Sequence, residues 1–354
     1  TLFRSLLIQE NMQKKVSNLN FLVVLTHYYF ITFFAWLILG PLLGDRWWWL
    51  FLLNSFSIYF FFLLPLPLIV AILTRKRSLA IGVSAIFIIG FFLYGELFLP
   101  SLAQIKKTGT QLTVMTFNTL GFNTESDGVI ASVRASGANI VAFQELNPEI
   151  AAAIEDELLE EYPYQILDPK IGVIGMGLIS QYPLEKREYR LKGRWVGDPQ
   201  LLKVDWLGRK ITVINFHAIP PGSILNFENL ARTTKERNRQ IQELLSFVKS
   251  REEPMVVLGD LNVSEHNDAY KILSAILQDA WRKKGWGFGH TFPGAVSPGS
   301  SRPAMAGIPL TPKWLIRLDY VFCSTQWQVE SASLGEWDEV SDHRPVKATI
   351  SLER

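Results

Sequence analysis

Hydrophobic positions follow two different patterns along the chain. The N-terminal part contains three long apolar runs: Phe21 to Leu43, Trp47 to Leu73 and Leu79 to Leu99. Each run reaches the ~20 residues that an α-helix needs to cross roughly 30 Å of hydrocarbon. From Gln111 onward, short β-branched runs alternate with turns and amphipathic helical patterns. We therefore predict three transmembrane helices followed by a domain that contains both helices and strands.

Charged residues follow the same division. The first hundred residues hold ten charges, whereas residues 101–354 hold 28 basic and 30 acidic side chains. The C-terminal part is thus nearly neutral, which disfavours an extended nucleic-acid surface. The alternative to membrane spans is a buried helical core, but the run Trp47 to Trp49 suits a lipid–water interface. We predict these domains: a membrane domain over 1–100, a linker over 101–110 and a soluble domain over 111–354.

Basic residues near the apolar runs predict the orientation of the chain. Arg4, Lys14 and Lys15 precede the first run, and the segment Arg75 to Arg77 connects the second run to the third. The positive-inside rule places these flanks in the cytoplasm. Three spans then place the soluble domain on the outer side of the cytoplasmic membrane. Polar residues within the runs, such as Asn54, are more simply explained by helix packing than by a transport path.

The soluble domain is predicted to be α/β. The expected strands are Leu112 to Phe117, Ile140 to Phe143, Gly175 to Ser180, Leu201 to Asp205, Ile211 to Asn215, Met255 to Leu258, Leu318 to Cys323 and Val346 to Ser351. The expected helices are Gly128 to Ala135, Pro148 to Glu161, Glu228 to Ser250 and Asp268 to Leu277. This pattern suggests two facing sheets or one large mixed sheet covered by helices. The single Cys323 excludes an internal disulfide.

Polar residues stand where several apolar strands end. Asn118, Glu145 and His217 each follow such a strand, and Asp260 and Asn262 follow the strand PMVVLG. Each of them alone is more often a turn residue or a hydrogen-bonding partner than a catalyst. Strand ends are nevertheless where sites assemble in layered α/β folds. The set as a whole therefore predicts a site at these strand ends.

Seven motifs together resemble the endonuclease/exonuclease/phosphatase superfamily over about residues 111–353. In chain order they are MTFNTLGFN, VAFQELNPE, GMGLISQYPL, INFHAIP, VVLGDLNVSEHNDAY, RLDYVFCS and SDHRPVKATI. The resemblance implies a four-layered α/β/β/α sandwich with the active site at one edge. It also implies metal-dependent hydrolysis of a phosphoester, with Mg²⁺ as the cofactor and Mn²⁺ as the alternative.

The resemblance also implies a role for each matching residue. Mg²⁺ prefers oxygen ligands and polarises a phosphoryl oxygen. Glu145 would be the main metal ligand, with Asn118 beside it and Asp342 near enough in sequence to join. Asp260 would deprotonate the attacking water, and Asn262 would hold the phosphate or the nucleophile. The remaining catalytic residues are the phosphoryl-oxygen donors His217 and His343, and Asp319, which would pair with His343. Whether one ion or two are used stays open.

Two features depart from the family pattern or stay undecided. Thr119 follows Asn118 where the family has Asn-Trp-Asn, and Asn123 is only a weak substitute for the second asparagine. His290 lies in GHTFPG, a loop that resembles a family loop ahead of the LDY strand. Both a substrate contact and a purely structural role are open for it.

Reaction and substrate have to be argued separately, because one fold serves many functions. Three spans with apolar loops resemble the membrane-anchored members associated with resistance to teicoplanin-like antibiotics. That likeness implies a lipid bilayer as a partner and a lipid-linked substrate such as undecaprenyl pyrophosphate. A tethered extracytoplasmic nuclease is the main alternative, and a non-catalytic binding module is a minor one.

Overall fold

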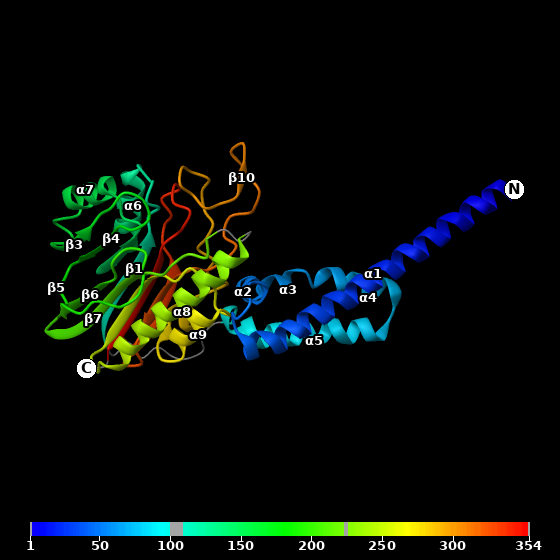
Figure 1. Ribbon diagram of the computed structural model, residues 1–354, viewed down its shortest axis with the longest axis horizontal. Helices are drawn as coiled ribbons and strands as arrows, with labels where there is room; N and C mark the ends of the chain where they lie inside the picture. Colours follow the sequence, from blue (N-terminus) through cyan, green and yellow to red (C-terminus); the bar gives the residue numbers. More distant parts are fainter. Residues whose placement is uncertain (1, 100–108, 223–225, 353–354) are drawn as a thin grey trace. The chain divides into compact units, whose positions relative to one another are not determined.

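The computed structural model describes residues 2–99, 109–222 and 226–352. The chain divides into two compact units, Thr1–Glu96 and Leu97–Arg354 (Figure 1). Residues 101–108 of the predicted linker lie outside the described residues. Each unit is described by itself below.

The first unit is helical. Its elements are α1 (Leu2–Leu43), α2 (Trp48–Ser55), α3 (Ile58–Phe62), α4 (Pro65–Thr74), α5 (Arg77–Tyr94) and the 3₁₀ turn Gly95–Leu97, whose last residue belongs to the second unit. Among the described residues, two helical segments are long and apolar enough to cross a membrane, Ser17–Leu43 and Arg77–Leu97. These correspond to the first and third predicted spans.

The second predicted span is not one straight helix. Trp48–Ser55 and Ile58–Thr74 are bent by 58° relative to one another, so a third span exists only if this bent pair counts as one. Ser57 lies at the break and donates its hydroxyl to the carbonyl oxygen of Asn54 at 3.1 Å. A side chain that bonds to the backbone in this way competes with helical hydrogen bonding. The apolar run was readable from sequence, but the break within it was not.

Large apolar side chains face outward from this unit. Phe92 is 80% exposed and Ile81 is 70% exposed, although both belong to an apolar helix. Soluble proteins rarely expose apolar surface of this extent. Asn54 instead faces inward, where its Oδ1 accepts from Trp36 Nε1 at 3.0 Å and its Nδ2 donates to Asp45 at 2.9 Å. These bonds agree with a packing role for Asn54.

The second unit contains two six-stranded sheets. The first sheet has the order β13 (Trp327–Leu334), β14 (Val346–Leu352), β1 (Thr110–Asn118), β2 (Ile140–Gln144), β4 (Met176–Ser180) and β3 (Tyr164–Asp168). The second has the order β5 (Leu184–Lys186), β6 (Gln200–Trp206), β7 (Arg209–His217), β8 (Met255–Asp260), β12 (Asp319–Cys323) and β9 (Gln278–Asp279). A separate hairpin pairs β10 (Ala304–Met305) with β11 (Ile308–Pro309). All eight predicted strands are present within these sheets.

Helices cover the sheets and confirm the predicted α/β class. The helices of this unit are α6 (Ser126–Ser136), α7 (Pro148–Glu157), α8 (Phe227–Lys249), α9 (Asp268–Ser274) and α10 (Ala280–Lys284). Side chains of α6 and α7 form one buried apolar cluster with side chains of β1, β2 and β4. Strands of the two sheets also contact each other, β1 with β8 and β12, and β2 with β7 and β8. The four-layered order stays a prediction.

Candidate active site

Two pairs of parallel strands deliver the predicted residues to one place. β1 runs parallel to β2, and β7 runs parallel to β8, with His217 opposite Asp260 in the register. Because the carboxyl ends of parallel neighbours share one edge of a sheet, the residues that end these strands become neighbours. Asn118 Nδ2 donates to Glu145 Oε1 at 3.1 Å and to Asp260 Oδ2 at 3.2 Å. One amide therefore joins the ends of the two sheets.

Glu145 is held in a tight backbone environment. Its own φ is 56°, and its Oε2 accepts from the backbone N–H of Gly121 at 3.0 Å. A Cβ on Gly121 would lie 2.1 Å from the carbonyl oxygen of Gly172, so only glycine allows this approach. Burial raises the pKa of Glu145, the bonds from Gly121 and Asn118 lower it, and the charge of Asp342 raises it further. Such a carboxylate gains stability from a nearby cation.

Asp260 is the central carboxylate of the site. His217 Nε2 lies 3.5 Å from Asp260 Oδ2 and 3.9 Å from Glu145 Oε1, and His343 Nε2 lies 3.8 Å from Asp260 Oδ2. Burial raises the pKa of Asp260 above its usual range; the positive charge of His343 opposes this shift, and Asp319 and Glu145 reinforce it. Burial lowers the pKa of His217 to about 3, which keeps its ring neutral.

His343 and Asp319 form the pair that the sequence predicts. His343 Nδ1 lies 2.8 Å from Asp319 Oδ2, and the ring packs against Phe292. Burial alone would lower the pKa of His343, but the charges of Asp319 and Asp260 outweigh it and raise the pKa well above the usual value. The imidazolium form is therefore favoured, and its Nε2 faces the centre of the site.

Asn262 and Asp342 take less direct positions. The backbone N–H of Asn262 donates to Asp260 Oδ1 at 2.8 Å, and its Nδ2 donates to the carbonyl oxygen of Ala218 at 3.0 Å. Its φ of 56° is uncommon for a residue other than glycine and is frequent at functional sites. Asp342 Oδ2 accepts from the backbone N–H of Ser301 at 2.8 Å. Asp342 thus ties a long loop to the site.

The donor set fits a divalent cation. Buried carboxylates crowd together here, and Asp319 Oδ1 has no hydrogen-bond partner among the residues that the structure describes. Ligand atoms of Asp260, Asp319 and His343 lie within 4.8 Å of one another, so this group is a second candidate beside Glu145. The Asp319–His343 bond already occupies one oxygen and one nitrogen of that group. Mg²⁺ prefers oxygen ligands, which favours the Glu145 side.

The sequence assigned Asn118 to the cation but gave no role to Ser341. Asn118 presents its amide nitrogen to the two carboxylates, while its Oδ1 accepts from Leu120 N at 3.1 Å. The amide would have to turn for its oxygen to reach a cation at Glu145. Ser341 Oγ donates to the carbonyl oxygen of Asn118 at 2.8 Å and accepts from His343 N at 3.0 Å, so it links both. Its place directly before Asp342 and His343 was the only signal for it.

Both amide atoms of Asn123, the weak substitute for the missing second asparagine, are hydrogen-bonded. Its Nδ2 donates to Asp338 Oδ2 at 2.9 Å, and its Oδ1 accepts from Glu125 N at 2.8 Å. His290 also has structural contacts: its Nδ1 lies 2.9 Å from the carbonyl oxygen of Trp314, and its ring stacks on Phe288. These contacts favour a structural role for both residues.

Between the two sheets, a buried polar network lies next to the site. Gln144 Nε2 donates to Asn215 Oδ1 at 2.7 Å, and Asn215 Nδ2 donates to the carbonyl oxygens of Phe143 and Gly177 and to Gln200 Oε1. Asn215 precedes His217 by two residues, so this network ties β2 of the first sheet to β7 of the second sheet beside the site. A polar residue inside the apolar strand ITVINF was the available sequence signal.

A buried ion pair supports the strand that carries Asp319. The Arg317 guanidinium donates to both oxygens of Asp279, at 3.1 and 2.5 Å, and to Glu265 Oε1 at 2.6 Å. Arg317 and Asp279 are almost fully buried. Leaving one member of such a pair without its partner costs about 3–5 kcal/mol.

We therefore expect Arg317→Met to lower the free energy of unfolding by about 3 kcal/mol or more, because Asp279 keeps a buried, uncompensated charge. The measurement is urea unfolding of the full chain in detergent, followed by tryptophan fluorescence. Arg190→Met is the control, because Arg190 pairs with Asp198 at the surface with 77% of its side chain exposed. That variant should lose less than about 1 kcal/mol. Equal losses in both variants would contradict the role given to Arg317.

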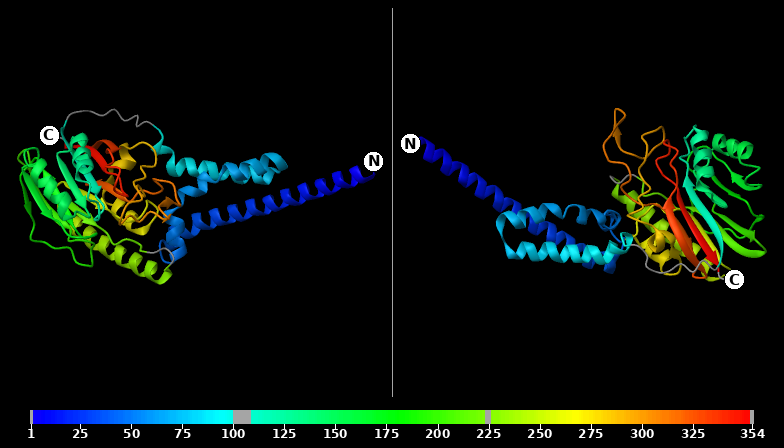
Figure 2. Two further views of the ribbon diagram at one scale, coloured as in Figure 1. Left: turned by 90° about the horizontal axis from the view of Figure 1, so that it is seen from above. Right: turned by 180° about the vertical axis from the view of Figure 1, so that it is seen from behind.

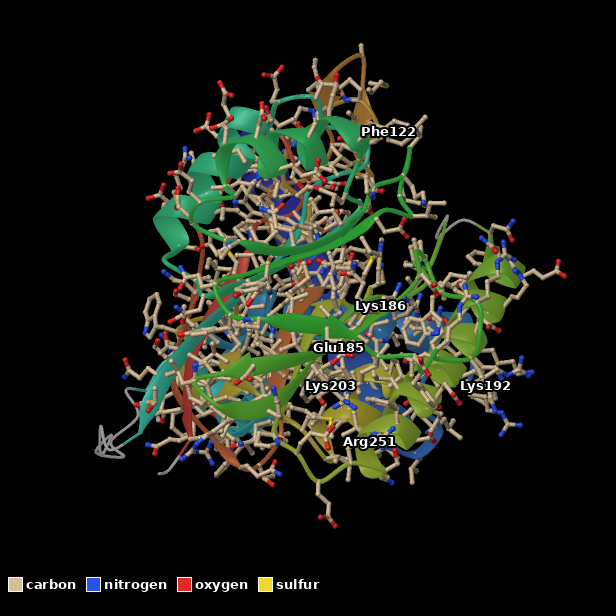
Figure 3. The ribbon with its side chains drawn as sticks, turned by 90° about the vertical axis from the view of Figure 1, so that its left-hand side faces the viewer. Phe122, Glu185, Lys186, Lys192, Lys203 and Arg251 are labelled. Atoms are coloured by element: carbon tan, nitrogen blue, oxygen red, sulfur yellow. The ribbon has the colours of Figure 1, made fainter. Side chains whose placement is uncertain are left out.

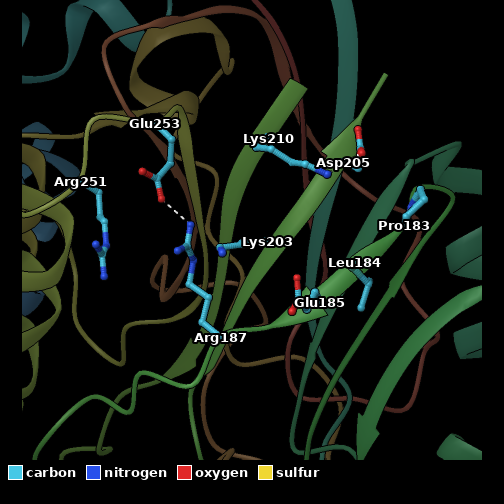
Figure 4. Close-up of a pocket in the computed structure, with 9 residues that line it drawn as sticks. All are labelled: Pro183, Leu184, Glu185, Arg187, Lys203, Asp205, Lys210, Arg251 and Glu253. Carbon is cyan, nitrogen blue, oxygen red and sulfur yellow. Dashed lines mark hydrogen bonds and ion pairs between the residues drawn. The ribbon is translucent and has the colours of Figure 1, made fainter. Parts of the chain in front are cut away.

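A separate hollow of about 480 Å³ lies elsewhere on the second sheet and contains none of the predicted site residues. It is lined by Pro183, Leu184, Glu185, Arg187, Lys203, Asp205, Lys210, Arg251 and Glu253 (Figure 4). Figure 3 shows Lys203 and Arg251 at the opposite end of this unit from Phe122, which directly follows Gly121. Arg187 is paired with Glu253, and Lys210 is paired with Asp205. Two of its four cations therefore already have carboxylate partners.

Comparisons with known proteins agree with this geometry. The model of the Endonuclease/Exonuclease/phosphatase family matches residues 115–343. An endonuclease/exonuclease/phosphatase from Beutenbergia cavernae is 20% identical, with a TM-score of 0.50 over 68% of this chain and 72% of that one. TDP2 from D. rerio in complex with a single-strand DNA product is 15% identical, with a TM-score of 0.53 over 68% and 99%. Truncated TDP2 from Caenorhabditis elegans is 18% identical, with a TM-score of 0.51 over 68% and 98%. No match was found among curated proteins.

Proposed function

We propose, from the premise that this chain belongs to the endonuclease/exonuclease/phosphatase family, that its site hydrolyses a phosphoric ester or pyrophosphate carried by a lipid. The family establishes the reaction class, so the chain is a metal-dependent phosphoric ester hydrolase and not merely a binding module. The observation that carries the assignment is the meeting of Glu145, Asp260, His217 and His343 at the strand ends.

Glu145 would hold the cation, with Asn118 turned toward it and Asp342 beside it. When bound, the cation polarises a phosphoryl oxygen and offsets the charge that develops during hydrolysis. Mg²⁺ is the expected ion, and Mn²⁺ is the alternative. Asp260 has a raised pKa and lies within 4 Å of both histidines, so we assign it to take the proton from the attacking water.

The two histidines act in different protonation states. His343, kept positive by Asp319, donates from Nε2 to a phosphoryl oxygen and attracts its charge. His217 is neutral, so it would donate a hydrogen bond to a phosphoryl oxygen without adding a positive charge. Asn262 orients Asp260 through its backbone N–H and supplies an amide for the phosphate or the nucleophile.

A lipid-borne substrate is supported by features outside the reacting centre. The first unit holds helices long enough to span a bilayer, and basic residues flank them on the side that we assign to the cytoplasm. We take the bent pair as the third span, so the proposed orientation has the catalytic unit on the outer face of the cytoplasmic membrane. Phe122, which is 51% exposed, lies on the loop whose Gly121 binds Glu145. Undecaprenyl pyrophosphate is the substrate that we propose to test first.

A tethered nuclease is the second candidate, because a similar structure, D. rerio TDP2, was solved with a single-strand DNA product. The catalytic part of the present chain is nearly neutral, however, with 28 basic and 30 acidic residues. Binding to DNA depends largely on cationic contacts with phosphates. This charge balance favours the lipid substrate.

The test compares phosphate release from undecaprenyl pyrophosphate with cleavage of plasmid DNA, using the full chain in vesicles. We expect lipid hydrolysis with Mg²⁺, its loss in excess EDTA and its return when Mg²⁺ or Mn²⁺ is restored, because the buried carboxylates require a cation. DNA cleavage without lipid hydrolysis would transfer the assignment to the nuclease. Hydrolysis that persists in EDTA would contradict the cation site.

A further inference from the structure

The hairpin formed by β10 and β11 exposes an apolar surface next to the site. We call residues 303–312 the apolar hairpin, since the segment PAMAGIPLTP contains no charged residue. Met305 is 69% exposed, Ile308 67% and Leu310 61%. The hairpin stands clear of the two sheets in Figure 1 and in the right-hand view of Figure 2. A surface of this kind in a folded protein marks an interaction site.

Turn geometry and local hydrogen bonds fix the conformation of the apolar hairpin. Ala306 and Gly307 have φ values of 50° and 78°, as a tight two-residue β-turn requires. At the base, Leu310 N donates to the carbonyl oxygen of Pro303 at 2.9 Å. The buried guanidinium of Arg302 donates to the carbonyl oxygens of Thr311, at 2.6 Å, and Gly294, at 2.7 Å. Hydrogen bonds, and not a hydrophobic core of its own, therefore hold the hairpin in shape while its apolar side chains stay exposed.

The apolar hairpin is connected to the catalytic residues. Ser301 N, one residue before Arg302, donates to Asp342 Oδ2. Gly294 N donates to the carbonyl oxygen of Asp342 at 2.6 Å. A Cβ on Gly299 would lie 2.3 Å from the ring of Phe122, so the loop before the hairpin packs closely on that ring. Phe122 itself is 51% exposed, which extends the apolar surface toward the loop that binds Glu145.

Aromatic and basic side chains surround the base of the apolar hairpin. Lys313 Nζ lies 4.1 Å from the ring centroid of Trp337, and the Arg344 guanidinium lies 4.4 Å from that of Trp314. The two indole rings pack edge to face at 5.1 Å. Tryptophan with lysine or arginine beside an apolar segment is typical of the lipid–water interface, where anionic headgroups attract the cations.

We propose that the apolar hairpin inserts into the interfacial region of a lipid bilayer and so brings the catalytic site to phosphoesters in that bilayer. This rests on the proposed function. The bilayer is the favoured occupant because the segment lacks charge, its base carries the tryptophan–cation pairs, and the same chain holds helices of bilayer length. Covalent attachment to those helices raises the effective concentration of the membrane, so a weak insertion suffices.

A matched position exists elsewhere in the same unit. Leu207 is 63% exposed at the β6–β7 turn, with φ of 53° and Gly208 after it. Its exposure is close to the 67% of Ile308, and it also belongs to a β-hairpin, although it lies in the turn and Ile308 lies directly after one. Its neighbours Asp205 and Lys210 form an ion pair, so this turn lacks the uncharged flanks of the apolar hairpin. The native Cys323 is buried and burial raises its thiol pKa to about 12, so a label reacts selectively with an introduced cysteine.

The experiment labels Ile308→Cys and Leu207→Cys with an environment-sensitive fluorophore in the full chain, reconstituted into phosphatidylethanolamine–phosphatidylglycerol vesicles with brominated lipids. Insertion predicts a blue shift and quenching by bromine at Ile308 and neither at Leu207. Aqueous emission at both positions would overturn the proposal. A label at Ile308 that is shielded but not quenched by bromine would indicate a protein surface and would also overturn it.

Activity gives an independent readout. In Ile308→Ser, hydrolysis of undecaprenyl pyrophosphate in vesicles should fall about tenfold, because a polar residue weakens interfacial insertion. Hydrolysis of soluble bis-p-nitrophenyl phosphate should stay unchanged, and Leu207→Ser should change neither rate. Equal loss on both substrates would refute a membrane role. If the wild type hydrolyses no lipid, the proposed substrate fails, while the labelling still decides whether the hairpin inserts.

Discussion

Replacing Asp260 with Asn is expected to reduce the turnover number about ten-thousand-fold, because the amide cannot take the proton from the attacking water. The side chains are nearly equal in size, and Asn262 N can still donate to the remaining oxygen at position 260. The measurement is the rate of phosphate release under saturating Mg²⁺. Thermal unfolding of the variant should change little, since burial already disfavours the charged form of Asp260.

Cation affinity separates the role of a base from that of a ligand. Calorimetric titration with Mn²⁺ should give an affinity for Asp260→Asn that lies within about tenfold of the wild type, as expected for a residue beside the ligands. A much larger loss would show that the cation is bound by the group Asp260, Asp319 and His343 instead of at Glu145. In that case His217 would become the leading candidate for the base.

Replacing Glu145 with Gln is expected to reduce hydrolysis at least about a thousandfold and to weaken Mn²⁺ binding strongly, because the main anionic oxygen ligand is lost. Burial raises the pKa of Glu145, so the neutral amide should not destabilise the fold. Phosphate release and Mn²⁺ titration are measured on the same preparation. Raising the Mn²⁺ concentration should recover part of the activity.

The chain offers a matched control for Glu145→Gln. Glu330 is likewise a buried carboxylate, but it lies on β13 and accepts from Ser351 Oγ at 2.6 Å. Glu330→Gln should leave both cation affinity and hydrolysis within about twofold of the wild type, since surrounding groups remain paired. Retention of full activity by Glu145→Gln, or equal losses in the two variants, would refute the assignment of Glu145.

Local pattern was enough for the parts of the fold where one face or one run is strongly apolar. The strand ending at Asp260 is buried throughout and the strand ending at Asn118 is buried over its last five residues, and such runs are readable without the structure. β13 was missed because WQVESASL is polar and interrupted by a bulge between Val329 and Ser331. An edge strand of this kind depends on pairing with its neighbour, here β14, and pairing is not a local property.

Long-range geometry decided what the site residues touch. The family resemblance named Asn118 and Asp342 as candidates around a cation and left Asn123 as a weak substitute for a missing asparagine. Only the structure shows the amide of Asn118 between two carboxylates, Asn123 on Asp338, and Asp342 on Ser301. Hydrogen bonds between residues far apart in sequence cannot be inferred from spacing.

The sequence by itself determined the chemistry available to this protein and the regions of the chain that carry it: apolar runs of bilayer length, then strands that end in carboxylates, amides and histidines. Tertiary structure decided the bend within the second run, the position of the Asn118 amide between two carboxylates, and the exposure of the apolar hairpin. The physical reason is that residue type and periodicity act locally. Burial, charge coupling and exposure depend on segments that meet only after folding.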